Sequence, residues 1–163
     1  MEKIYGTKER QDCLVRIGRT KWMLFYGFGK DSESSESGWE YRHTFDHKPT
    51  LSEIRELIIS TIDTATQEKI VRGFVWNDIS VYLSTENQFN FKAAYDMAEM
   101  SQGETLPVKF KLGEDEAGHP IYHEFTSIDD IRDFYSKAMN HINQTLNDGW
   151  TEKDAVNLSV FTI

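Results

Sequence analysis

Apolar and polar residues alternate most clearly in the middle of the chain, over residues 71–84 (VRGFVWNDISVYLS). Two alternating runs flank Asn77 and Asp78, and both residue types tolerate the positive φ angles of a two-residue hairpin turn. In this register one face of the hairpin is apolar and carries Phe74, Trp76, Ile79, Val81 and Leu83. A slip of one residue would expose that whole face, so we predict a half-buried hairpin that serves as scaffold.

The N-terminal part of the chain shows the same strand-like pattern. Residues 11–28 contain two runs joined by a hairpin connection at residues 18–21, and residues 39–46 alternate again. The intervening stretch, residues 29–38 (GKDSESSESG), has the composition of a flexible loop. We therefore predict a small N-terminal antiparallel unit of three strands over residues 1–48.

Helical spacing begins after this unit. Thr50 and Glu53 have the spacing of a capping box, and the apolar residues that follow predict a helix ending near residues 61–64. A second helix is expected from Thr85 to about Ser101. Two adjacent stripes of this helix are apolar, and we expect both to be buried. The first stripe is Phe89, Ala93, Met97 and Met100, and the second is Phe91, Ala94, Tyr95 and Ala98.

A second hairpin and a long helix complete the pattern. Alternation over residues 106–112 and 121–125 predicts two strands around the loop GEDEAGHP. The longest helix should begin at Ser127, because the helix dipole stabilises the two acidic residues that follow in its first turn. We expect this helix to stop at Gly149, and a short helix to follow after Thr151. The fold class is α+β, with β-hairpins alternating with helices in a main domain over residues 49–163.

Composition narrows the function classes. The 163-residue chain has 27 acidic and 18 basic residues, a net charge of −9, which argues against nucleic-acid binding through phosphates. No apolar run approaches 18 residues and the N-terminus lacks the apolar core of a secretory signal, so we expect a soluble protein with no membrane partner. Cys13 is the only cysteine, which excludes a disulfide within the chain and indicates a structural thiol.

Candidate chemistry is sparse. His43 and His47 are four residues apart, as are His119 and His123, but neither pair has the convergent third ligand that a zinc site needs. The sequence contains no nucleophile elbow, no phosphate-binding glycine loop and no Cys-x-x-Cys pair. We therefore predict no catalytic residue, no metal site and no cofactor.

Aromatic residues are dense in the N-terminal unit, and a unit of this size cannot bury all of them alone. Either the unit packs on the main domain, or it presents an apolar patch to another subunit. The residues that we assign to such an interaction surface are Trp22, Phe25, Tyr26, Trp39 and Tyr41.

Residues 66–161 resemble an uncharacterised domain family of phage and prophage proteins that are often encoded near tail genes. The segments that carry the resemblance are Ile70-x-x-Gly73-Phe74-x-Trp76, Leu83-Ser84 with Gln88, Phe125-Thr126-Ser127-Ile128, and Thr151-Glu152. The family commonly has a histidine three residues after that last threonine, where this chain has Asp154. The resemblance implies a virion-associated or tail-assembly role, in the bacterial cytoplasm or the virion, and no catalytic residues.

Three functions follow as hypotheses. The first is a non-enzymatic phage or prophage protein that acts through contacts with other phage proteins or with itself, as a homo-oligomer. The alternative is a small enzyme or ligand-binding module with a cleft between the N-terminal unit and the main domain, where Tyr41, His43 and His123 would lie. The third, an acidic mimic of nucleic acid, needs a continuous stripe of acids, whereas the acids here cluster in loops and helix starts.

Overall fold

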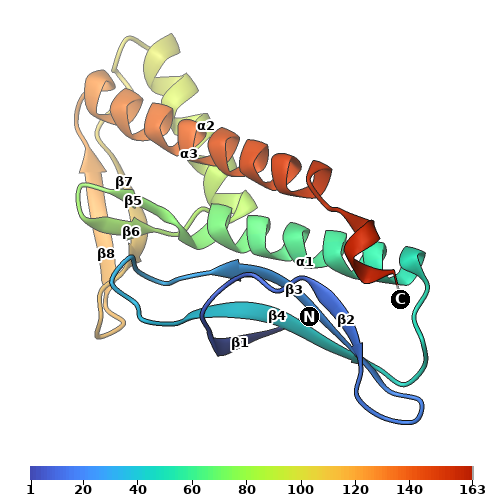
Figure 1. The fold of residues 1–163 in the computed structure, drawn as a ribbon. Helices are drawn as coiled ribbons and strands as arrows, with labels where there is room; N and C mark the ends of the chain where they lie inside the picture. The colour runs from blue at the N-terminus through green and yellow to red at the C-terminus, as the bar shows by residue number, and fades with distance from the viewer. Residues whose placement is uncertain (163) are drawn as a thin grey trace. The chain divides into compact units, whose positions relative to one another are not determined.

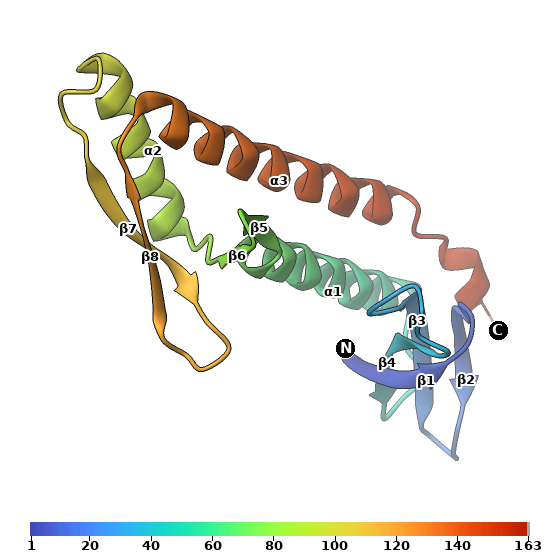
Figure 2. The same ribbon diagram turned by 90° about the vertical axis from the view of Figure 1, so that its left-hand side faces the viewer.

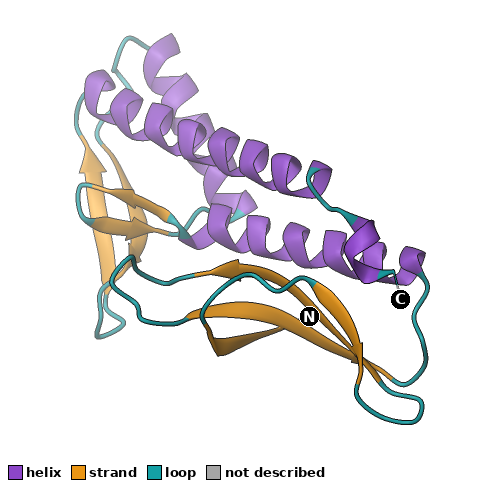
Figure 3. Cartoon of the chain, in the orientation of Figure 1, coloured by secondary structure: helices purple, strands orange, loops and turns teal. Residues whose placement is uncertain are grey.

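The computed structural model describes residues 1–162 and confirms the α+β class (Figure 3). The chain forms two compact units, one of Met1–Asp63 with the segment from Glu152 onward, and one of Thr64–Thr151. These units differ from the domain limits expected from the sequence, 1–48 and 49–163. Helix α1 (Leu51–Arg72) begins in the first unit and ends in the second, whereas helix α3 (Ile128–Asp154) begins in the second unit and its last residues belong to the first.

The first unit contains one antiparallel sheet with the strand order β1-β4-β3-β2 (Figure 1). The strands are β1 (Glu2–Thr7), β2 (Cys13–Arg16), β3 (Trp22–Gly29) and β4 (Gly38–Phe45). The sequence pattern predicted three strands and missed β1, because only Ile4 and Tyr5 mark it as strand. Its place is fixed by pairing with β4, where Ile4 lies opposite Glu40 and Tyr5 lies opposite Trp39.

One face of this sheet packs against the start of α1. The core cluster contains Leu14, Leu24, Tyr26, Ile54, Ile58, Ile62 and Phe161. Phe161 belongs to a short 3₁₀ turn, η1 (Leu158–Phe161), where the sequence predicted a short α-helix. The predicted capping box of α1 is confirmed: Thr50 N–H donates to the Glu53 carboxylate at 2.8 Å, and Glu53 N–H donates to Thr50 Oγ1 at 3.2 Å.

Both long helices extend past their predicted ends. Helix α1 continues to Arg72 and ends at Gly73, whose N–H donates to the Lys69 carbonyl at 2.8 Å. Helix α3 continues past Gly149, which the sequence marked as a stop. A Cβ at Gly149 would lie 2.5 Å from Thr66 Oγ1, so this glycine allows α1 and α3 to approach closely within the second unit.

In the second unit, two hairpins and helix α2 (Thr85–Met100) lie on one side of α3 and pack against its buried face (Figure 2). The predicted turn between β5 (Phe74–Trp76) and β6 (Ile79–Val81) is confirmed by positive φ angles of 47° at Asn77 and 62° at Asp78. The second predicted hairpin is β7 (Val108–Glu114) and β8 (Pro120–Phe125). Phe134 of α3 is 1% exposed and contacts the rings of Phe74, Trp76, Phe91 and Phe125.

Candidate functional site

The five residues predicted as an interaction surface do not form one surface. Trp22 and Tyr26 share the face of β3 that also carries the fully buried Leu24, and Tyr41 packs against the same core. Tyr26 is 2% exposed, and its hydroxyl donates to the Glu152 carboxylate at 3.4 Å. Burial raises the pKa of Tyr26 to about 12, so the phenol stays protonated. Tyr26 is therefore a core residue, which corrects its assignment to an interaction surface.

Phe25 and Trp39 have separate environments. Phe25 alternates with Leu24 and Tyr26, so it lies on the opposite face of the sheet, where the Arg42 guanidinium stands 5.2 Å from its ring centroid. Arg42 also pairs with the buried carboxylate of Glu40 at 2.7 Å. Trp39 contacts the Lys3 ammonium, which stands 4.3 Å from its ring centroid. These contacts stabilise the sheet from within the chain, and an interaction surface in this unit stays a prediction.

Cys13 lies opposite Phe25 in the β2–β3 pair and is partly buried. Burial, and then the nearby charges of Glu40 and Asp12, raise the pKa of its thiol. A raised pKa suppresses the thiolate, which is the reactive form. The geometry therefore agrees with a structural thiol.

The histidines of each candidate pair have separate acidic or apolar partners. His47 pairs with Glu53 at 2.9 Å, His119 with Asp115 at 3.2 Å and His123 with Asp130 at 2.9 Å. Burial is the main cause that lowers the pKa of His43. Within residues 1–162, no group of three or more His, Cys, Asp or Glu side chains converges in a way that could hold a metal ion.

Helix α2 differs from its prediction in the exposure of one of its two apolar stripes. The stripe of Phe91 and Ala98 is buried, and Tyr95 stacks on Tyr135 of α3 at a centroid distance of 4.9 Å. The stripe of Phe89, Ala93, Met97 and Met100 is exposed, with exposed fractions of 73% for Phe89, 53% for Met97 and 83% for Met100. The prediction that both stripes are buried is wrong for this one, because α3, β7 and β8 cover only one side of α2. We call these four residues the α2 stripe.

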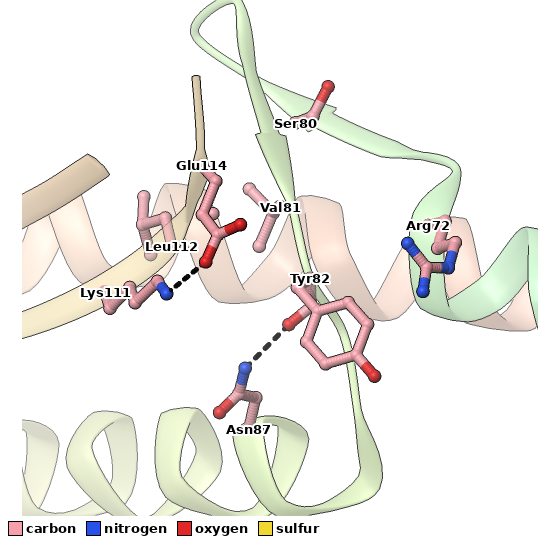
Figure 4. Close-up of a pocket in the computed structure, with 9 residues that line it drawn as sticks. Arg72, Ser80, Val81, Tyr82, Asn87, Lys111, Leu112 and Glu114 are labelled. Atoms are coloured by element: carbon pink, nitrogen blue, oxygen red, sulfur yellow. Dashed lines mark hydrogen bonds and ion pairs between the residues drawn. The ribbon is translucent and has the colours of Figure 1, made fainter. Parts of the chain in front are cut away.

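A pocket of about 540 Å³ opens beside the place where the two hairpins of the second unit meet (Figure 4). Tyr82 N–H donates to the Leu112 carbonyl at 2.8 Å, which joins the end of β6 to β7. The strands approach so closely that a Cβ at Gly113 would clash with the Ser80 carbonyl oxygen. The pocket is lined by Arg72, Ser80, Val81, Tyr82, Asn87, Lys111, Leu112, Gly113 and Glu114.

The pattern of residues along the chain did not predict this pocket. The lining comes from four separate segments: the end of α1, the end of β6 with the residue after it, the first turn of α2, and β7. The local signal that could have marked it is Leu112-Gly113, since a glycine inside a strand pattern often marks a bulge or a close backbone approach. The β7–β8 register does shift there, between Lys111 and Gly113.

Comparison of the chain with protein-family models, with curated proteins and with solved structures finds no match. Across the part of the chain that the structure covers, no helix is both long enough and apolar enough to span a membrane. Two features of the structure are therefore the candidate functional sites: the α2 stripe and the pocket beside β6 and β7.

Proposed function

We propose that this chain is a non-enzymatic protein that acts by protein–protein contact, with the α2 stripe as the contact surface and a second copy of the chain as the partner. The observation that carries this proposal is the exposure of Phe89, Met97 and Met100 on one face of a single helix. Contiguous exposed apolar side chains on a folded protein mark contact surfaces, because water solvates them poorly.

The stripe is self-complementary in shape. Ala93 is small and lies between the bulky Phe89 and the two methionines. In an antiparallel pairing, Phe89 of each copy lies against the methionine end of the other, and the central alanines allow the helix axes to approach. The same patch on both copies then forms an isologous two-fold interface.

The charges beside the stripe favour this orientation. Lys92 and Asp96 lie one helical turn apart on the same flank of α2, where they form an ion pair at 2.6 Å. Antiparallel pairing brings that flank against the same flank of the second copy, so Lys92 of each copy faces Asp96 of the other. Parallel pairing instead brings it against the opposite flank, which carries Asn90. Charge complementarity of this kind selects one orientation at an interface.

Energetics set the expected strength. Full burial of a large apolar side chain stabilises by about 1.5–3 kcal/mol. Association itself costs at least about 4 kcal/mol in lost translational and rotational freedom. Three exposed side chains from each copy are therefore sufficient for a weak dimer, with a dissociation constant between roughly millimolar and micromolar order.

Sedimentation equilibrium tests this proposal. Wild-type protein should show a monomer–dimer equilibrium, and the double substitution Phe89→Ser/Met100→Ser should shift it to monomer. The control is Val75→Ser, which removes another exposed apolar side chain (58%) outside the stripe and should leave the equilibrium unchanged. A wild-type monomer at millimolar concentration, or a dimer that persists in the double variant, would contradict the proposal.

The biological setting is a further part of the proposal. The resemblance of residues 66–161 to phage and prophage proteins encoded near tail genes supports a tail-associated structural or assembly role, in the bacterial cytoplasm or the virion. Mass spectrometry of purified phage particles tests the virion role directly. Its outcome is independent of whether the chain dimerises through α2.

A further inference from the structure

The pocket beside β6 and β7 has a lining suited to a small molecule, and it is separate from the α2 stripe. Two of its lining residues, Val81 and Leu112, are core residues (1% and 0% exposed) whose side chains point away from it, so the accessible lining comes from the remaining residues and the backbone. Its volume of about 540 Å³ lies within the range of pockets that bind small organic ligands. All nine lining residues belong to the Thr64–Thr151 unit, so the pocket does not depend on the other unit.

The charges of the pocket are not balanced. Lys111 pairs with Glu114 at 2.6 Å, so each of these two charges offsets the other. The Arg72 side chain forms no ion pair or hydrogen bond with any residue in the described part of the chain. Its guanidinium carbon stands 5.6 Å from the ring centroid of Tyr82. The pocket therefore has one surplus positive charge, in a chain whose net charge is −9.

The contact with Tyr82 gives Arg72 a defined position without using its N–H groups. A guanidinium over an aromatic face is held by the negative face of the ring, and its donors remain available at its edge. A carboxylate or phosphate can accept two of these donors at once. Figure 4 shows the Arg72 guanidinium on the side of Tyr82 away from the Lys111–Glu114 pair, so the two polar ends of the pocket are separate.

Tyr82 and Asn87 complete the lining. The Tyr82 side chain is 44% exposed, so part of its ring is accessible to a flat apolar group. Asn87 donates its side-chain N–H to the Tyr82 carbonyl at 2.8 Å, which fixes the backbone that carries the ring. The accessible Tyr82 ring beside the Arg72 guanidinium favours a ligand with an aromatic body over a bare inorganic ion.

We propose that this pocket binds a small aromatic anion, a ring that carries one carboxylate or one phosphate, with the anionic group on Arg72 and the ring against Tyr82. The proposal goes beyond the contact role of α2 and does not depend on it. Carboxylate and phosphate share the oxyanion chemistry that Arg72 recognises, and separate titrations with an aromatic carboxylate and an aromatic phosphate distinguish them.

Isothermal titration calorimetry with benzoate and phenyl phosphate tests the proposal, with benzyl alcohol as the uncharged ring and inorganic phosphate as the charge without a ring. At least one aromatic anion should bind, and both control probes should bind at least about tenfold more weakly. Arg72→Met should weaken binding of that anion at least about tenfold, and Arg72→Lys should weaken it less, since lysine keeps the charge without the planar fork. Tyr82→Leu should weaken it several-fold.

The matched control is Arg55→Met, which removes another exposed arginine of α1 outside the pocket and should leave binding unchanged. Amide chemical-shift changes on titration should centre on residues 80–82 and 111–114. The proposal is overturned if neither aromatic anion binds at millimolar concentration, if Arg72→Met and Arg72→Lys both bind like wild type, or if the shift changes centre elsewhere.

Discussion

Glu53 and Thr50 exchange hydrogen bonds at the start of α1: the Glu53 carboxylate accepts the Thr50 N–H, and Thr50 Oγ1 accepts the Glu53 N–H. Glu53 also accepts from the Thr50 hydroxyl at 2.8 Å and pairs with His47 at 2.9 Å. The hydrogen bonds from Thr50, and then the one with His47, lower the pKa of Glu53 to about 2. The first turn of α1 is thus tied to a charged carboxylate.

A pH dependence of stability follows from this low pKa. Because the folded state holds the Glu53 proton less tightly than the unfolded chain, the stabilisation is present above the unfolded pKa of 4.5 and is lost as pH falls towards 2. Glu53→Gln should lower the melting temperature at pH 7, and the difference from wild type should narrow below about pH 4.5. Thermal melts at several pH values check this. A difference that stays constant from pH 7 to pH 3 would show that the charge of Glu53 does not contribute.

Exchanging the charges beside the α2 stripe tests the orientation of the proposed dimer. Lys92→Glu or Asp96→Lys alone should weaken the dimer by about three- to tenfold, because like charges then face each other across the interface. The double exchange Lys92→Glu/Asp96→Lys should restore the wild-type dissociation constant, since opposite charges face each other again. Sedimentation equilibrium measures all three variants. A double variant no stronger than either single variant would exclude antiparallel pairing.

Gly149 tests the close approach of α3 to α1. Alanine is a better helix former than glycine by about 1 kcal/mol, so helix propensity alone predicts that Gly149→Ala stabilises the protein. We expect Gly149→Ala to destabilise instead, because the new Cβ would lie 2.5 Å from Thr66 Oγ1 and 3.3 Å from Thr66 Cβ. Thr66→Ala in the same chain should recover part of the loss. Urea unfolding gives both values, and a stabilised single variant would show that the helices separate without cost.

Asp78 tests the hairpin turn. Its φ of 62° lies in the left-handed region, which glycine adopts without the cost of a side chain. Asp78→Gly should raise the free energy of unfolding by about 0.5–1 kcal/mol, since Asn-Gly suits a two-residue turn better than Asn-Asp. Glu116→Gly, in a loop position without positive φ, should be neutral or destabilising. Equal effects of the two substitutions would argue against strain at Asp78.

Local chemistry explains which elements the sequence could predict. The Asn77-Asp78 turn and the Thr50–Glu53 box depend on residues close together in the chain, and both are confirmed. Strand β1 depends on pairing with residues more than thirty positions away, and its own residues, Glu2 and Lys3 among them, have weak strand character. Such a strand has no signal that a local pattern can detect.

The candidate functional features also depend on contacts that a local sequence pattern cannot detect. An apolar face at helical spacing is identical in sequence whether it is covered or exposed, so the pattern of Phe89, Met97 and Met100 could not reveal its exposure. By contrast, Phe25 and Tyr26 are neighbours in a strand, so the alternation of side chains already predicts that they lie on opposite faces of the sheet. The pocket requires Arg72 and Lys111 to lie on one surface, which depends on how β6 meets β7.

The return of the C-terminal segment to the first unit affects how the protein is synthesised. Phe161 shares a core cluster with Leu24, yet the ribosome adds the whole Thr64–Thr151 unit between them. At roughly 5–20 residues per second, the nascent sheet waits several seconds before this last aromatic side chain can reach it. The inserted unit, being continuous, can complete its own core during translation, whereas the unit that begins first is the last to close.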